Sequence, residues 1–241
     1  MSSFRQSPFA NMSPVVKYII IINIILFIPV LLFDNDLHSP IASTFGVYYF
    51  NSPDFRVWQL LTHMFMHGGW MHIFFNMYAL YIFGNTVEFT LGSKRFFQFY
   101  FICGFGAIAL QMYVQAFELH SMIGSYTISN AQELYRTISP EMVQKIRSIY
   151  EVPMVGASGA IFGVLIAFAM LYPNVELMLL FPPIPIKAKY LIPIFVAFEI
   201  YSGFQENPGD SVAHFAHLGG ALFGFFMIKL WGLSRRDNHY H

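Results

Sequence analysis

Polar side chains interrupt three apolar segments of the sequence. The first segment contains His72 and Asn76, the second contains Ser158 and the third contains His217. A serine hydroxyl is a weak nucleophile until a neighbouring base accepts its proton, and histidine is a common base. His217 is the plausible base for Ser158. These residue types therefore predict nucleophilic catalysis.

Attack of a serine on a carbonyl group creates an oxyanion, which needs hydrogen-bond donors held in place. His72 and Asn76 are four residues apart, so they share one face of a helix. We expect their side chains, together with the backbone N–H of Ser158, to donate to that oxyanion. The glycines on either side, Gly156 and Gly159, would let a substrate backbone come close.

Acidic residues and metal ligands are the next groups to consider. Asp210 is the carboxylate nearest to His217 in sequence and falls in a loop, so we expect a Ser-His dyad rather than a triad. Glu199 is expected to be a partnered structural carboxylate rather than part of a proton relay. His63, His67 and His72 could suggest zinc, but no HExxH motif or nearby acidic ligand accompanies them. We expect neither a metal nor a cofactor.

The composition indicates the elements that must position these residues. Of the 241 residues, 56% are hydrophobic and 11% are charged, against roughly 25% charged in soluble domains. Thirteen basic and thirteen acidic residues cancel, so no basic surplus suggests nucleic acid. Cys103 lies in an apolar run and is expected to be a small buried thiol. The sequence therefore predicts a protein of the lipid bilayer.

Helical spans follow from the lengths of the apolar runs. A hydrocarbon core about 30 Å thick is crossed by roughly 20 apolar residues. Six runs approach that length: 17–33, 69–87, 96–117, 156–172, 188–204 and 212–231. No repeat or linker divides the chain, so we expect one domain over 1–241. The expected fold is an all-α polytopic membrane protein with a bundle of six transmembrane helices.

The distribution of Lys and Arg predicts the orientation of these spans, because short cytoplasmic loops keep an excess of them. If the N-terminus is cytoplasmic, one side of the membrane holds Arg5, Lys17, Lys94, Arg95, Lys187, Lys189, Lys229, Arg235 and Arg236. Both termini are therefore expected in the cytoplasm. The second, fourth and sixth spans then enter from the extracytoplasmic side with their polar residues in the first turns. We expect Ser158 and His217 each to lie roughly five residues into its span, which is about 8 Å deep. At this common depth the two side chains can meet.

Small residues indicate that the fourth and sixth spans approach closely. Gly159 and Gly163 lie four residues apart, as do Gly220 and Gly224, and such spacing brings helix backbones together. The two longer extracytoplasmic loops cover residues 34–68 and 118–153. In the second loop we expect a short helix from Pro140 to Tyr150.

The ordered set of motifs resembles the rhomboid family of intramembrane serine proteases, over nearly the whole chain. The family's GxSG motif is Gly156-Ala157-Ser158-Gly159, and its AHxxG motif is Ala216-His217-Leu218-Gly219-Gly220. Its HxxxxHxxxN pattern runs from His67 through His72 to Asn76. Glu88, four residues before Gly92, resembles a structural glutamate of the family.

The resemblance implies a role for each matching residue. Ser158 would be the nucleophile, His217 the general base, and His72 and Asn76 the oxyanion donors. Supporting roles would fall to His67, near the mouth of the site, to His214, a packing or hydrogen-bonding residue, and to Phe162, whose ring could stack on His217. The chain departs from the family at Trp58-Gln59, where the family has Trp-Arg, and Phe162 often is Tyr in the family.

The resemblance also implies substrates and a location. The substrates would be membrane-anchored proteins cut in or near their transmembrane segments, and the site would open to the extracytoplasmic side of the cell (inner) membrane. A rhomboid-like pseudoprotease that binds transmembrane helices without cutting them is the alternative. A transporter using the histidines and Glu199 is a second alternative, although it would predict inverted repeats that the sequence lacks.

Overall fold

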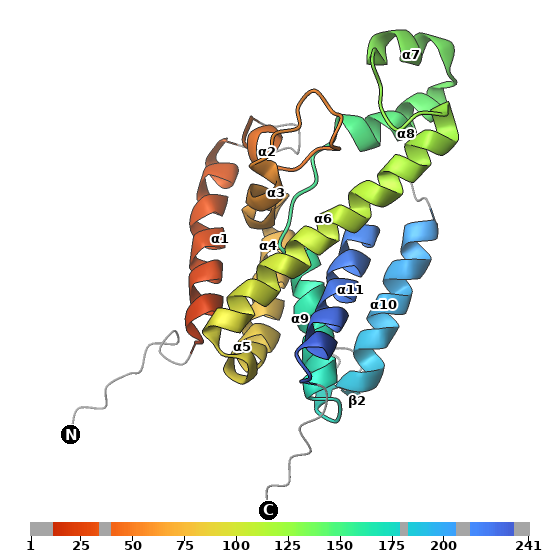
Figure 1. Cartoon of the computed structure of the whole chain (residues 1–241). Coiled ribbons are helices and arrows are strands. Elements are labelled where there is room, and N and C mark those ends of the chain that lie inside the picture. The colour runs from red at the N-terminus through yellow and green to blue at the C-terminus, as the bar shows by residue number, and fades with distance from the viewer. Residues whose placement is uncertain (1–11, 34–39, 179–182, 206–212, 234–241) are drawn as a thin grey trace, which may run out of the picture.

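Long helices dominate the computed structural model, which describes residues 12–33, 40–178, 183–205 and 213–233 (Figure 1). Each predicted run corresponds to helical structure. The helices are α1 (Pro14–Phe33), α4 (Trp70–Ala79) continued through a π-helical turn (Leu80–Gly84) into α5 (Asn85–Leu91), α6 (Ser93–Ile123), α9 (Ser158–Leu171), α10 (Ala188–Phe204) and α11 (His214–Leu230). The predicted helical ranges are therefore confirmed, whereas the number of membrane spans remains a prediction.

Helix length distinguishes these elements. Among the described residues, α1 and α6 are both long and apolar enough to cross a membrane, and α9 and α11 are shorter apolar helices. The 14 residues of α9 extend over about 21 Å at 1.5 Å per residue. That length is less than the roughly 30 Å of a hydrocarbon core, so α9 alone does not reach across it.

Glycines bring α6, α9 and α11 into backbone contact. A Cβ atom at Gly220 of α11 would overlap the carbonyl oxygen of Gly159 on α9, and one at Gly224 would lie 2.8 Å from the Cα of Gly163. The fully buried Cys103 of α6 packs against Gly163. The predicted close approach of the two glycine pairs is therefore confirmed.

Glu88 joins the start of α1 to the end of α5. Its carboxylate accepts hydrogen bonds from the backbone N–H groups of Val15 (3.0 Å) and Val16 (2.9 Å) and from the hydroxyl of Ser93 (2.7 Å). Amide groups in the first turn of a helix have no acceptor within that helix. Glu88 supplies the acceptor for α1, which is a structural role.

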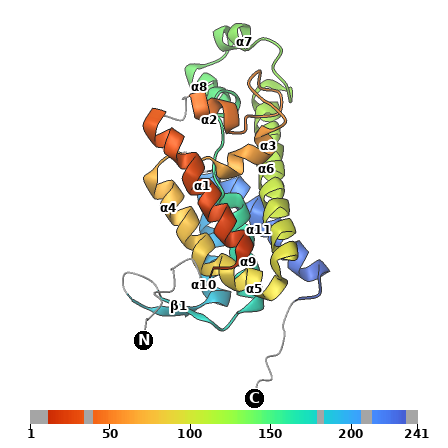
Figure 2. The same ribbon diagram turned by 90° about the vertical axis from the view of Figure 1, so that its left-hand side faces the viewer.

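Two chain segments, residues 40–66 and 124–155, lie together at one end of the bundle and are named the loop cap here (Figures 1 and 2). They contain α2 (Pro40–Phe45), α3 (Gln59–Thr62), a 3-10 turn (His63–Phe65), α7 (Ala131–Thr137) and α8 (Pro140–Tyr150). The predicted helix from Pro140 to Tyr150 is confirmed. At the other end, β1 (Glu176–Met178) pairs with β2 (Pro185–Lys187) in an antiparallel hairpin that the sequence did not predict.

Polar contacts hold the loop cap together around a small core. The hydroxyl of Tyr150 donates to the side-chain oxygen of Asn51 (2.8 Å), and that of Tyr49 donates to the carbonyl oxygen of Tyr126 (2.8 Å). Ile146 and Ile149 are buried in the same cluster. Burial, with Tyr150 nearby, raises the pKa of Tyr49 to about 12. The Tyr49 hydroxyl therefore stays protonated, and able to donate, at neutral pH.

Gln59 organises the first segment of the loop cap, at the position where the family has arginine. This side chain is 1% exposed. Its amide nitrogen donates to the carbonyl oxygen of Asp54 (3.1 Å), and its amide oxygen accepts from the backbone N–H of Arg56 (2.9 Å). A neutral amide therefore satisfies backbone groups of this loop from the inside.

Candidate active site

Ser158 is the first residue of α9, at the point where the chain descends from the loop cap into the bundle (Figure 1). The sequence predicted that the serine lies several residues inside its helix, and this prediction is wrong. Because Ser158 begins the helix, its backbone N–H has no acceptor within α9. No side chain caps that end either. The start of α9 therefore presents the hydroxyl and backbone donors together.

Ser158 and His217 meet across the contact between α9 and α11. The Ser158 Oγ lies 2.8 Å from the His217 Nε2, and His217 occupies the first turn of α11. Phe162, one turn after the serine, stacks on the imidazole with ring centroids 4.3 Å apart and an interplanar angle of 8°. The structure thus places Ser158 beside His217 and stacks Phe162 on the imidazole, as predicted. The catalytic roles of these residues stay predictions.

His72 approaches the serine from α4, the helix that also carries Asn76. A Cβ atom placed at Gly156 would lie 2.8 Å from the His72 Nε2 and 3.5 Å from the Ser158 Oγ. The imidazole and the hydroxyl therefore border the same small space. Asn76 is buried, and within the described chain its amide nitrogen has no hydrogen-bond acceptor. His67 packs edge-on against His72 with centroids 5.1 Å apart.

Glu199 of α10 reaches the other edge of the His217 ring. Its Oε2 lies 2.9 Å from the His217 Nδ1 and 2.6 Å from the His214 Nδ1. The expectation that no carboxylate lies beside His217 is therefore wrong, although Glu199 is partnered as predicted. Asp210, the carboxylate considered from the sequence, lies outside the described residues. His214 makes the hydrogen bond that the resemblance implied.

The same three side chains are the metal-ligand candidates of the described chain. One donor atom from each of Glu199, His214 and His217 lies within 4.8 Å of the other two. Two histidines and a glutamate are also a known ligand set for zinc. The two short N–O separations are those of hydrogen bonds.

Gln111 and the backbone of His63 support the site in ways that the sequence did not predict. The side-chain oxygen of Gln111 on α6 accepts a 3.0 Å hydrogen bond from the backbone N–H of Ala216, at the start of α11. The carbonyl oxygen of His63 accepts a 2.9 Å bond from the N–H of Gly156. Gln111 was detectable as a polar residue within an apolar helix. The His63 contact is through the backbone and leaves no sequence signal.

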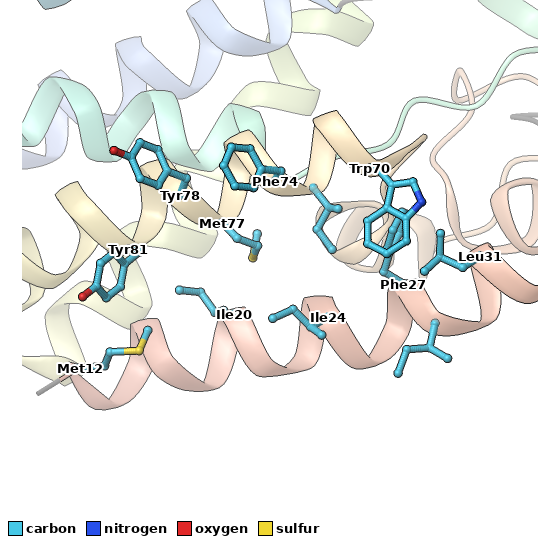
Figure 3. A pocket seen from close by; sticks show the side chains of 12 residues that line it. Met12, Ile20, Ile24, Phe27, Leu31, Trp70, Phe74, Met77, Tyr78 and Tyr81 are labelled. Carbon is cyan, nitrogen blue, oxygen red and sulfur yellow. The ribbon is translucent and has the colours of Figure 1, made fainter. Parts of the chain in front are cut away.

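An apolar groove of about 540 Å³ lies between α1 and α4 (Figure 3). Ile24 and Phe27 of α1 face Trp70 and Phe74 of α4 across it. None of the polar residues described above lines this groove. Its lining suits hydrocarbon, and the candidate catalytic residues gather instead at the start of α9.

Comparisons with known proteins identify the family of the chain. The family model of the rhomboid domain matches residues 54–234. The chain is 26% identical to the putative rhomboid protease YdcA of Bacillus subtilis over 226 residues, covering 92% of each chain. It is 28% identical to the rhomboid protease AarA of Providencia stuartii over 178 residues, covering 69% of this chain and 53% of that protein.

A mitochondrial relative matches over a similar range. The chain is 28% identical over 210 residues to an uncharacterized mitochondrial rhomboid protein of Schizosaccharomyces pombe, covering 76% of this chain and 53% of that protein. The chain thus spans about half the length of that relative. Because the family model covers well over half of the residues, the chain belongs to the rhomboid family of polytopic helical membrane proteins.

Proposed function

We propose that the protein is an intramembrane serine endopeptidase that cuts membrane-anchored proteins in or near their transmembrane segments. The observation that carries the proposal is the 2.8 Å contact between the Ser158 Oγ and the His217 Nε2. Family membership and the relatives described as rhomboid proteases support the same reaction class.

The first half of the reaction forms an acyl-enzyme. His217 accepts the hydroxyl proton of Ser158 as the Oγ attacks the peptide carbonyl, and the protonated imidazole then gives that proton to the leaving amine. Water, activated by His217 in the same way, hydrolyses the ester and releases Ser158. Phe162 keeps the imidazole in plane during both halves. No cofactor takes part in this scheme.

Donors for the oxyanion come from two helices in this proposal. The backbone N–H of Ser158 lies at the positive end of the α9 dipole, which favours developing negative charge. His72 borders the serine oxygen, and the Asn76 amide has a donor to spare. A donor that is unpaired at rest is free to bind the oxyanion when it forms.

The proposed depth follows from the length of α9. If the end of α9 near Tyr172 lies at one boundary of the hydrocarbon core, a helix of about 21 Å begins roughly 9 Å inside the other boundary of a 30 Å core.

Lys94 and Arg95 lie in the first turn of α6, at the end of the bundle opposite the loop cap. The positive-inside rule makes that end cytoplasmic, so the site would open to the extracytoplasmic side beneath the loop cap. We place the six spans in the cell membrane, with both termini inside.

The decisive experiment compares wild type with Ser158→Ala and His217→Ala in liposomes that contain a single-span substrate. We expect cleavage and fluorophosphonate labelling by wild type. Both should fall to background in each variant, because nucleophile and base act as a unit. Cleavage that persists in purified Ser158→Ala would overturn the assignment. Protease added to right-side-out and to inside-out membrane vesicles from the producing cells digests loops on the exposed face only, and so tests the orientation.

The alternative function is a pseudoprotease that binds transmembrane helices without cutting them. Both Ser158 and His217 are in place and in contact, which favours hydrolysis. Substrate binding by wild type without labelling or cleavage would favour the alternative.

A further inference from the structure

Glu199 has a largely enclosed carboxylate on a helix whose other side chains are mostly apolar. Its neighbours Phe195 and Phe198 are exposed at the surface of α10. The Glu199 side chain itself is 12% exposed, and the side chains of His214 and His217 are similarly enclosed. An ionisable group inside a membrane is costly unless it is paired and tends to mark function. A lipid-facing packing role does not account for this residue.

The contact with Glu199 selects the tautomer of His217. A neutral imidazole carries one N–H, and an ionised carboxylate can only accept hydrogen bonds. The 2.9 Å contact with Glu199 therefore requires the proton on Nδ1. Nε2 is then left with its lone pair towards Ser158, 2.8 Å away. This is the form of His217 that can accept the hydroxyl proton.

Resting on the proposed protease function, we propose that Glu199 is a positioning residue for His217 and makes the site a Ser158–His217–Glu199 triad. Glu199 holds the imidazole in its productive tautomer and rotamer. It also stabilises the imidazolium that forms when the Ser158 proton moves to Nε2. The proton stays on His217 until the leaving amine takes it, so Glu199 is not protonated in the cycle.

His214 is the second partner of the carboxylate. Its Nδ1 donates to the same Oε2 at 2.6 Å, from the first turn of α11, three residues before His217. Two donors from one helix thus fix one oxygen carried by another helix. His214 positions Glu199, which in turn positions His217.

A metal ion is the competing explanation for the same cluster. Ligand atoms bound tetrahedrally to zinc at about 2.0 to 2.1 Å lie roughly 3.3 Å apart. The N–O separations here are 2.6 and 2.9 Å, which suits shared protons rather than a shared cation. If zinc did bind to Nδ1 of His217, a chelator would change activity, whereas the triad predicts no change.

The test uses the full-length protein in liposomes with a single-span substrate. Glu199→Gln keeps the size of the side chain but can donate to Nδ1 and so stabilise the wrong tautomer. We expect kcat to fall by about 10²- to 10⁴-fold, as for loss of the acid in other triads, with KM changed less than threefold. Glu199→Asp restores the carboxylate and should recover at least about tenfold of kcat, as expected for a charge-assisted contact. Equal kcat for wild type and Glu199→Gln would overturn the proposal.

A second measurement uses wild-type protein and so does not depend on the folding of a variant. In wild-type protein with ¹⁵N-labelled histidine, the resting His217 should show a proton on Nδ1 and a bare Nε2. A proton on Nε2 would contradict the triad. If wild-type protein neither cleaved the substrate nor reacted with fluorophosphonate, the protease function itself would be contradicted. Failure of the triad and failure of the protease function are therefore distinguishable.

Discussion

The contact between α9 and α11 and the loop cap above it are built by opposite means. The helices meet backbone to backbone through glycines, with no polar side chain between Gly159 and Gly220. The loop cap is joined by side-chain hydrogen bonds such as those of Tyr150 and Gln59. The first kind of contact fixes the distance between Ser158 and His217, and the second depends on individual side chains that can be replaced one at a time. The site lies at the boundary between them.

The glycine contact should be the most sensitive to change. Gly220→Ala places a Cβ against the carbonyl oxygen of Gly159, and backbone cannot rotate away, so α9 and α11 must separate. We expect a loss of at least about 3 kcal/mol in the free energy of unfolding, at the upper end for overpacking. Labelling of Ser158 should disappear. Thermal unfolding in detergent and fluorophosphonate labelling measure both effects.

Gly203→Ala is the matched control for this prediction. Its added Cβ would meet the ring of Phe215 at 3.3 Å, and a side chain can yield. We expect a change below about 1 kcal/mol, as for Gly→Ala substitutions in tolerant positions. If Gly220→Ala unfolds and labels like Gly203→Ala, direct helix contact is not what positions the dyad.

A substitution at the boundary between the two regions should lower activity more than it lowers stability. At Gly156, φ is +132° and an added Cβ would lie 2.8 Å from the His72 Nε2. Gly156→Ala should therefore displace His72 from the serine and lower kcat/KM by about 10²- to 10³-fold, the effect of losing an oxyanion donor. Steady-state cleavage measures the loss.

Gly124→Ala is the control for Gly156→Ala, because it carries backbone strain without a collision of the added Cβ with a side chain. Gly124 has φ +71° and no atom within 4 Å of an added Cβ, so the variant carries strain of roughly 1–2 kcal/mol away from the site. Its kcat/KM should equal that of wild type. A similar loss of activity in both variants would remove the steric argument for His72.

The loop cap should give the smallest effect. Tyr150→Phe removes the hydroxyl that donates to Asn51 and Ile128, which costs about 1–3 kcal/mol if the acceptors stay buried. We expect faster hydrogen exchange across residues 124–150 and unchanged labelling of Ser158 by a small fluorophosphonate. Tyr135→Phe, which loses only an exposed bond to Glu151, should exchange like wild type. Slower labelling in Tyr150→Phe would mean that the loop cap also shapes the site.

Hydropathy and charge were enough to predict the helical ranges, because each apolar run is long and bounded by polar residues. The approach of Ser158 to His217 followed from placing both near the start of helices that enter from one side. Glu199 was missed as a neighbour of His217 because α10 is apolar around most of its surface. No periodic pattern in such a helix indicates which face turns inward, so its register became clear only in three dimensions.

The loop cap was harder to predict for a different reason. The buried role of Gln59 depends on backbone carbonyl groups of Asp54 and Ser43 turned towards it. Backbone contacts between segments far apart, such as that of Val47 with Met154, leave no signature in residue type. The short helices α2 and α3 are similarly too brief for a hydrophobic period to develop.

The shortness of α9 has a consequence for hydration. The chain that leads down to Ser158 is not helical, and lipid cannot satisfy irregular backbone. The pairing of Val47 with Met154 and the bond from Gly156 to His63 satisfy part of it from within the protein. In the proposed reaction, the backbone N–H groups left without a cap at the start of α9 are therefore groups that would bind the water consumed in hydrolysis.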